Sequence, residues 1–214
     1  MRTPPSSHPP YRRLTQRLFA RCVASSRGRI DERHGALKRE LFGALTGTVL
    51  EIGPGTGANL PYLPPDVRWI GIEPNPYMHP YLHEEAAQLG RTVEVRQGVA
   101  EELTAPDASV DAVVCTLVLC SVHDPAQVLR EVRRVLRPGG RFVFIEHVAA
   151  RRGTWQRRAQ DLVQPLWTPV GEGCHPNRET WLTIEAAGFD QLDLVHFDIG
   201  VPFVGPHIAG VGVK

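Results

Sequence analysis

The sequence predicts an α/β fold: a doubly wound, mostly parallel sheet of seven strands that ends in an antiparallel hairpin. From residue 48 onward, apolar or β-branched runs alternate with helical patterns, which is typical of such sheets. The runs at 110–114 and 142–145 are almost continuously apolar, as expected of strands covered by helices on both faces. Only a short loop separates the last two runs, and a parallel crossover needs a longer connection, so this pair is expected to be antiparallel.

Three segments precede the first strand. The first ten residues, MRTPPSSHPP, are proline-rich and are expected to form a disordered tail. Residues 11–24 predict a helix with one apolar face and several arginines, and a second helix is expected near 31–44. A basic amphipathic helix can lie on a membrane surface, but packing over the core with solvated arginines is the preferred interpretation. We expect residues 11–47 to cover the active site of a domain that spans 48–214.

The elements of this domain follow in order. Strands are predicted at 48–52, 67–72, 92–96, 110–116, 141–148, 189–198 and 207–214. Helices are predicted at 76–89, 124–136, 154–164 and 177–187. The alternation favours a Rossmann-like sheet in a single domain without internal repeats.

Composition and charge exclude several classes of function. The 214 residues are 42% hydrophobic and 22% charged, which is ordinary for a globular domain. The formal net charge of +1 gives no overall field that would attract nucleic acid or an anionic membrane. No apolar stretch approaches the roughly 20 residues that a membrane span requires. We therefore expect a soluble, cytoplasmic protein that acts on a small molecule and makes at most weak, salt-sensitive contact with membranes.

A glycine-rich loop follows the first strand and suggests a nucleotide-bearing ligand. Gly53, Gly55 and Gly57 permit positive φ angles and let a ligand approach the backbone without a Cβ in the way. Gly53, Gly55 and Ala58 also satisfy the dinucleotide pattern, and Glu73 lies 20 residues after Gly53, where an acid that binds ribose is expected. A nicotinamide dinucleotide is thus an open alternative at this point.

Three details favour a different ligand. Glu51 lies just before the glycines, where it would repel a pyrophosphate but suit a cation such as the α-ammonium group of a methionyl moiety. The triphosphate-binding pattern GxxxxGK[ST] does not occur. The antiparallel end of the sheet fits class I S-adenosylmethionine methyltransferases better than dehydrogenases. Glu73 would then accept hydrogen bonds from both ribose hydroxyls.

Longer motifs strengthen this interpretation. The chain resembles the methyltransferase-like family of small, membrane-anchored thiol methyltransferases from residue 38 to its C-terminus. The resemblance is carried by KRELF, EIGPGTGANL, PPDV, EPNP, VVCTLVLCSV, REVRRVLRPGGRF, EHVAA, EGC, RETW and PHIAGVGVK. It implies methyl transfer from S-adenosylmethionine to the sulfur of a small aliphatic thiol. In the wider superfamily, methyl groups go to oxygen, nitrogen or carbon of lipids or quinone precursors. Unlike the anchored members, the chain is expected to carry only the arginine-rich helix, and no hydrophobic span, before this region.

The resemblance also implies which residues bind the methyl donor. The glycine after the third predicted strand is expected near the adenine. At the end of the fourth strand, Leu117 and Leu119 are expected to border the methyl donor and the acceptor pocket. The expected cofactor-binding residues are Glu51, Gly53, Gly55, Gly57, Asn59, Glu73, Pro74, Gly98, Ala100, Glu101, Thr116 and Leu117.

Candidate catalytic groups lie near the same edge of the sheet. His147 and His123 are candidate general bases, and Glu146 lies beside His147 in the sequence. Cys120 is interpreted as a buried structural cysteine, because its neighbours are apolar. The four cysteines form no CxxC pair, so we expect reduced thiols and no metal site.

Overall fold

The computed structural model describes residues 10–214, with the side chains of residues 13–26 and 34–214. The tail predicted at residues 1–10 lies outside this range except for Pro10, which begins the first helix.

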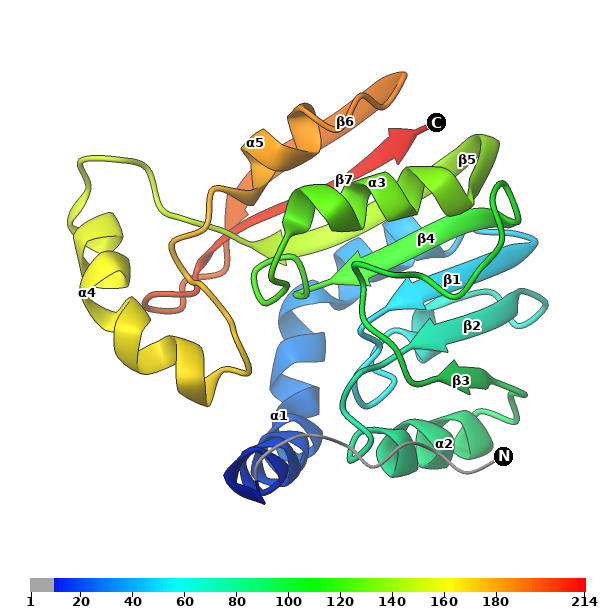
Figure 1. Cartoon of the computed structure of the whole chain (residues 1–214), viewed down its shortest axis with the longest axis horizontal. Coiled ribbons are helices and arrows are strands. Elements are labelled where there is room, and N and C mark those ends of the chain that lie inside the picture. The colour runs from blue at the N-terminus through cyan, green and yellow to red at the C-terminus, as the bar shows by residue number, and fades with distance from the viewer. Residues whose placement is uncertain (1–9) are drawn as a thin grey trace.

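Seven strands form one mixed sheet in the order β3-β2-β1-β4-β5-β7-β6, which confirms the predicted fold (Figure 1). The pairs among β3, β2, β1, β4 and β5 are parallel, and β7 pairs antiparallel with both β5 and β6. The strands are β1 (Thr48–Ile52), β2 (Arg68–Ile72), β3 (Glu94–Arg96), β4 (Val110–Thr116), β5 (Leu136–His147), β6 (Gln191–Asp198) and β7 (Pro206–Val213). Six of them lie within two residues of their predicted bounds, and β5 begins five residues before its predicted start.

Helices cover both faces of this sheet. Figure 1 shows α3 and α5 in front of it and the second half of α1 behind it. The helices after the first strand are η1 (Leu60–Tyr62), α2 (His79–Gln88), α3 (Pro125–Val135), α4 (Trp155–Val170) and α5 (Thr180–Glu185). The start of α3 is fixed by Asp124, whose side chain accepts a hydrogen bond from the backbone N–H of Gln127.

The core consists of two apolar clusters, one on each face of the sheet. Successive side chains of β5 alternate between them: Phe142 and Phe144 belong to the cluster under α3, and Val143 and Ile145 to the cluster under α1 and α2. All four side chains are fully buried. The continuous apolar run at 142–145 therefore has the predicted cause, a strand covered on both sides.

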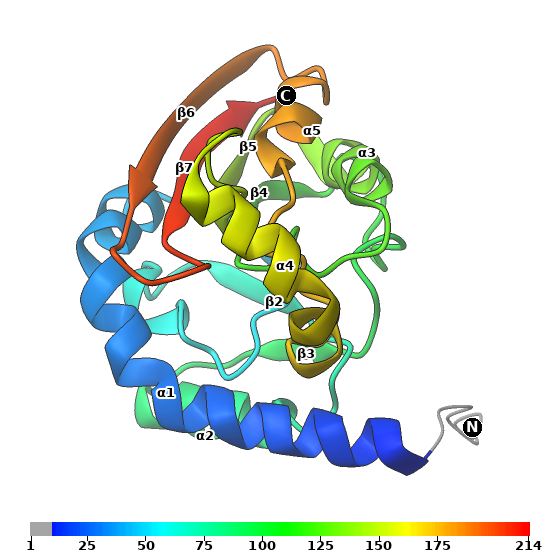
Figure 2. The same cartoon turned by 90° about the vertical axis from the view of Figure 1, so that its left-hand side faces the viewer.

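The N-terminal segment differs from its prediction. One helix, α1 (Pro10–Phe42), takes the place of the two predicted helices. Figures 1 and 2 show it bending between a first half that runs along α2 and a second half that packs on the sheet. The hydroxyls of Ser25 and Ser26 both donate to the carbonyl oxygen of Cys22, and such bonds bend a helix without ending it. The sequence break between the two apolar patterns is a bend, not a loop.

Helix α4 lies beyond the edge to which the parallel strands point (Figures 1 and 2). Its buried Gln160 fastens it to the domain by donating to the carbonyl oxygens of Val148 (3.2 Å) and Phe203 (2.7 Å) and accepting from the N–H of Ala150 (2.7 Å). Its opposite face is apolar and open to solvent at Trp155, Leu162, Leu166 and Val170. Within residues 10–214, no helix is long and apolar enough to cross a membrane.

Candidate active site

The glycine loop lies at the edge where the parallel strands end. The N–H of Gly53 donates to the carbonyl oxygen of Ile72, which joins the end of β1 to the end of β2. A Cβ on Gly53 would lie 2.6 Å from Cγ2 of Val118, in the loop after β4. Gly53 is therefore required by packing against the chain itself. It brings three strand ends together, as expected where ligands bind in open α/β sheets.

Gly55 has a different function from Gly53. Its φ angle is +56°, and a Cβ at this position would have no atom of the described part of the chain within 4 Å. The backbone of Gly55 thus faces open space, where a ligand can approach it closely. The third glycine, Gly57, has a φ of +85° and packs against Leu60 and Glu85. Of the three predicted glycines, Gly55 is the one that the structure leaves exposed to a ligand.

Glu73, just after β2, supports the glycine loop through a hydrogen bond. One of its carboxylate oxygens accepts from the N–H of Gly55 (2.9 Å) and the other from the N–H of Asn75 (2.8 Å). The side chain is nearly buried, and burial raises the pKa of its carboxyl group. Each oxygen can accept a second hydrogen bond, so the geometry remains compatible with two ribose hydroxyls. The bond to Gly55 is a structural role that the sequence did not predict.

Glu51 lies in a buried polar network at the end of β1. Its carboxylate accepts from Asn59 Nδ2 and Trp69 Nε1, each at 2.9 Å. Asn59 Nδ2 also donates to Thr116 Oγ1, at the end of β4. Burial raises the pKa of Glu51 to about 7, although both hydrogen bonds and the nearby Lys38 oppose the shift. A buried carboxylate with so high a pKa is stabilised by any cation that binds beside it.

This network fits the α-ammonium group of a methionyl moiety. Within residues 10–214, Asn59 Oδ1 is buried and has no hydrogen-bond partner. An ammonium group carries three donors, which match this acceptor and the carboxylate of Glu51. Glu51, Asn59 and Glu73 are therefore the residues that would hold the methionyl and ribose parts of S-adenosylmethionine.

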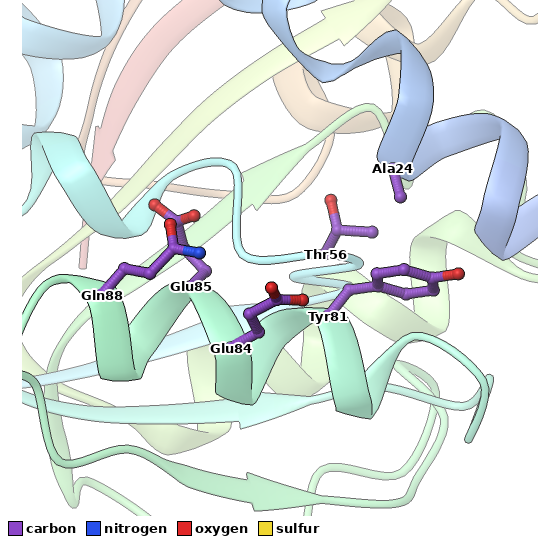
Figure 3. A pocket seen from close by; sticks show the side chains of 6 residues that line it. All are labelled: Ala24, Thr56, Tyr81, Glu84, Glu85 and Gln88. Carbon is purple, nitrogen blue, oxygen red and sulfur yellow. The ribbon is translucent and has the colours of Figure 1, made fainter.

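A hollow of about 210 Å³ adjoins the glycine loop between α1 and α2 (Figure 3). It is lined by Thr56 of the loop, by Ala24, and by residues of α2, including the acidic Glu84 and Glu85. Neither Glu51 nor Glu73 lines it, and its carboxylates would repel a methionyl carboxylate. The methyl donor is better matched to the other side of the loop, above Gly55.

Comparison with known proteins identifies the family. Residues 50–144 match the family model described as a methyltransferase domain. The chain is 42% identical to human thiol S-methyltransferase TMT1B over 190 residues, which cover 83% of this chain and 78% of that protein. It is 42% identical to human thiol S-methyltransferase TMT1A over 86% of this chain and 81% of that one. The crystal structure of YcgJ from Bacillus subtilis shares the fold, with a TM-score of 0.65, 19% identity and coverage of 86% and 98%.

The chain belongs to the thiol S-methyltransferase family. It is an enzyme that uses S-adenosylmethionine as methyl donor. The nicotinamide alternative that the glycine pattern left open is thereby excluded as the main activity.

On the predicted adenine side of the site, the side chain of Glu101 already binds the protein's own backbone. Glu101 accepts hydrogen bonds through one oxygen from the backbone N–H groups of His123 (2.8 Å) and Asp124 (3.3 Å). It thus fixes the loop after β4. Gly98 lies against Ile72, Ala100 is buried and Pro74 is exposed. Roles for these positions in adenine binding remain predictions.

The loop after β4 begins with strain. Leu117 has a φ angle of +59°, which is an outlier for a residue with a bulky side chain, and its N–H donates to the carbonyl oxygen of Ile145. Strained backbone held by hydrogen bonds is common at functional sites. Leu117 directly follows Thr116, the last residue of β4. The chain therefore leaves the sheet between Thr116, which belongs to the Glu51 network, and Leu119.

The two histidines predicted as bases occupy different environments. His147 ends β5 and is buried, with Nε2 3.1 Å from Sγ of Cys174. Its Nδ1 is buried and has no partner among the described residues. His123 is exposed on the loop after β4. Glu146 supports the loop, because it accepts hydrogen bonds from Sγ of Cys115 (3.3 Å) and the N–H of Val118 (3.0 Å).

A turn after α4 completes this side of the site. The N–H of His175 donates to the carbonyl oxygen of Cys120, and a Cβ on Gly173 would lie 2.9 Å from the carbonyl oxygen of Ser121. Arg178 donates to the carbonyl oxygens of Leu119 (2.6 Å) and Val122 (2.7 Å). Sequence reasoning assigned no function to Cys174 or Arg178, although the quoted EGC and RETW motifs contain them.

Gly55→Ala should weaken cofactor binding without unfolding the methyltransferase. The new Cβ would occupy the space that the ligand needs, and its positive φ would cost about 1 kcal/mol of folding free energy. We expect the affinity for S-adenosylhomocysteine, measured by calorimetry, to fall at least about tenfold. Gly90→Ala is the matched control, since Gly90 also has a positive φ (+65°) and no described atom within 4 Å of a Cβ, but lies just after α2 and away from the glycine loop. Equal affinity in both variants would contradict the placement above Gly55.

Binding of S-adenosylhomocysteine should also depend on pH through Glu51. Below pH 7 the free protein carries Glu51 largely protonated, whereas a bound ammonium group favours the carboxylate. Binding then releases a proton, and affinity falls as the pH drops below 7, by up to about tenfold per unit. Calorimetry from pH 5.5 to 8 would measure this slope. Glu51→Gln should bind S-adenosylhomocysteine more weakly, and its affinity should not depend on pH in this way. The same slope in both proteins would place the ammonium group elsewhere.

Proposed function

We propose that the protein transfers the methyl group of S-adenosylmethionine to the sulfur of a small alkyl thiol. The observation that carries this proposal is the 42% identity, across more than four fifths of the chain, to proteins named thiol S-methyltransferases. The geometry supports it. The donor-binding residues lie on one side of the loop after β4, and buried, uncharged groups such as Leu119 and Cys120 lie along that loop.

The chain's own residues orient the two reactants. S-adenosylmethionine supplies a sulfonium, which is an excellent leaving group, so alignment of the thiol sulfur, methyl carbon and sulfonium provides much of the acceleration. Glu51 and Asn59 would hold the methionyl end and Glu73 the ribose. Leu117 and Leu119 border the acceptor. A thiol with a pKa near 8.5 is only a few per cent thiolate at neutral pH, so a group that favours the thiolate raises the rate.

Of the two proposed bases, the structure favours His147. It is buried beside Cys174, and its Nδ1 has no hydrogen-bond partner among the residues that the structure describes, whereas His123 is exposed. A buried group with an unsatisfied nitrogen can accept a proton from a bound thiol.

The acceptor class is tested with a labelled methyl donor. The purified chain is offered small alkyl thiols, the matching alcohols and amines, a quinone precursor and a phospholipid headgroup amine. We expect label in the thiols and at least about tenfold less in the matched alcohols, because sulfur is the better nucleophile near neutral pH. Preferential labelling of an oxygen, nitrogen or carbon acceptor would replace the thiol proposal with the alternative of lipid or quinone-precursor methylation.

We also propose that the protein works in the cytoplasm and touches membranes only weakly, through α1. Leu14 and Leu18 are 60% and 55% exposed, and Arg17 and Arg21 are exposed beside them. A short apolar face with a few arginines, each contributing roughly 1 kcal/mol near an anionic surface, gives reversible attachment that salt screens.

Liposome flotation at low and high salt tests the weak membrane contact through α1. We expect partial flotation with anionic liposomes at low salt, reduced by Leu14→Glu with Leu18→Glu, and no flotation at high salt. The matched pair Leu162→Glu and Leu166→Glu alters the exposed face of α4 and should have little effect. Flotation that persists at high salt and is abolished by the α4 pair would show that α4 is an apolar membrane contact and would contradict the proposal.

A further inference from the structure

Three side chains far apart in the sequence meet beside the loop after β4. Cys120 comes from that loop, His147 from the end of β5 and Cys174 from the turn after α4. All three are buried, and their ligand atoms lie within 4.8 Å of one another. The sequence predicted no metal site because the cysteines have no CxxC spacing. The fold creates the proximity instead.

We propose that Cys120, His147 and Cys174 bind a zinc ion whose fourth coordination position receives the thiolate of the methyl acceptor. The second half of this inference rests on the proposed thiol acceptor; the first half does not.

The donor set and its spacing suit zinc. Two cysteine sulfurs and one imidazole are ligands that zinc prefers, and three protein ligands with one open position are typical of catalytic sites. Zn–N bonds of about 2.0–2.1 Å and Zn–S bonds of about 2.3 Å place the ligands of one tetrahedral ion roughly 3.5–3.8 Å apart. The observed limit of 4.8 Å, and the 3.1 Å between His147 Nε2 and Cys174 Sγ, bracket this spacing. Small side-chain movements suffice to bind the ion.

The surroundings favour a sulfur that carries negative charge. Trp167 Nε1 lies 3.1 Å from Cys174 Sγ, and an indole N–H can only donate. Such a hydrogen bond to a ligand sulfur is typical of the groups that surround metal thiolates. This donor set is therefore suited to a bound cation.

The charges also balance. Two thiolates neutralise Zn²⁺, and a third thiolate from the acceptor would leave one negative charge. Arg178 lies beside the cluster, close enough to interact electrostatically with Cys120 and Cys174. It compensates this charge, while the nearby carboxylate of Glu146 is held by Cys115 and Val118. The site thus favours an anionic fourth ligand.

Zinc would solve the problem of generating a thiolate at neutral pH. The acceptor's S–H bond would break as its sulfur binds zinc, and the proton would pass to water, because a coordinating thiol is deprotonated. With zinc bound, His147 would act as a ligand and not as the base. A lone pair of the acceptor sulfur then forms the new bond to the methyl carbon. The bond between this carbon and the sulfonium sulfur breaks, and its electron pair stays on that sulfur, which leaves as the thioether of S-adenosylhomocysteine. Glu172 directly precedes Gly173 and Cys174 and interacts electrostatically with Glu73. The turn that holds Cys174 is therefore near the proposed donor site.

Metal binding is tested on the full chain, reduced and stripped of metal with a chelator. After zinc is added back and the excess is removed, we expect one tightly bound zinc per chain by plasma mass spectrometry. With cobalt(II) as probe, we expect a thiolate-to-metal absorption band, which zinc then removes. Cys120→Ser and Cys174→Ser should each lower zinc affinity at least about a hundredfold. Cys115→Ala and Cys22→Ser are the controls, one buried and one exposed, and should keep it.

Affinity for S-adenosylhomocysteine checks that each variant is folded. The cobalt spectrum of the unaltered chain needs no variant at all. A chain that binds no zinc when reduced, or equal zinc in Cys174→Ser and Cys115→Ala, would overturn the proposed site. So would loss of two free thiols through a Cys120–Cys174 disulfide that persists under reducing conditions.

The open coordination position is tested separately from the acceptor class. A small monothiol that is a substrate should shift the cobalt spectrum saturably, and metal removal should lower its methylation at least about tenfold without changing S-adenosylhomocysteine affinity. Zinc binding without methylation of any thiol would overturn the proposed function but not the site. Thiol methylation that is unaffected by metal removal would overturn the inference but not the function.

Discussion

Two buried carboxylates at one edge of the sheet organise the donor site. Removing a carboxylate from water is costly unless hydrogen bonds replace the lost hydration. Glu51 obtains them from Asn59 and Trp69, and Glu73 from the backbone of Gly55 and Asn75. Because these partners lie in the glycine loop, in β2 and in the loop after β2, satisfying the carboxylates fixes the glycine loop before any ligand arrives. The donor site is therefore preorganised by the same bonds that make its burial tolerable.

These hydrogen bonds do not fully stabilise the two carboxylates, and a bound ligand can add the missing stabilisation. Burial raises the pKa of both acids, so the hydrogen bonds do not fully offset the lost hydration. A cation beside Glu51 would do so. The unpartnered Asn59 Oδ1 points to the same conclusion, since a buried acceptor without a donor is costly. A neutral or anionic ligand gains nothing from this arrangement, which is a physical reason for a cationic methionyl group.

The sequence predicted what depends on local pattern. Strand positions, the hairpin and the places of Glu51, Gly55 and Glu73 follow from periodicity and from short spacings along the chain. It failed where a tertiary contact or a single hydrogen bond decides. Ser25 and Ser26 turn two expected helices into one bent helix, and no periodicity shows that. The cluster of Cys120, His147 and Cys174 could not be predicted, because its members meet only when β4, β5 and the turn after α4 are assembled.

This difference separates the two halves of the active site. The residues proposed to hold the donor, from Glu51 to Glu73, lie on adjoining parallel strands and the loops that directly follow them. The residues on the acceptor side are joined over much longer separations, as Arg178 is to Leu119, and depend on how α4 is attached. Gln160 supplies several of those attachments. Changes in α4 and the turn after it can therefore reshape the acceptor side while the carboxylate network that holds the donor stays intact. Shared cofactor chemistry with divergent acceptors is what this division of the chain permits.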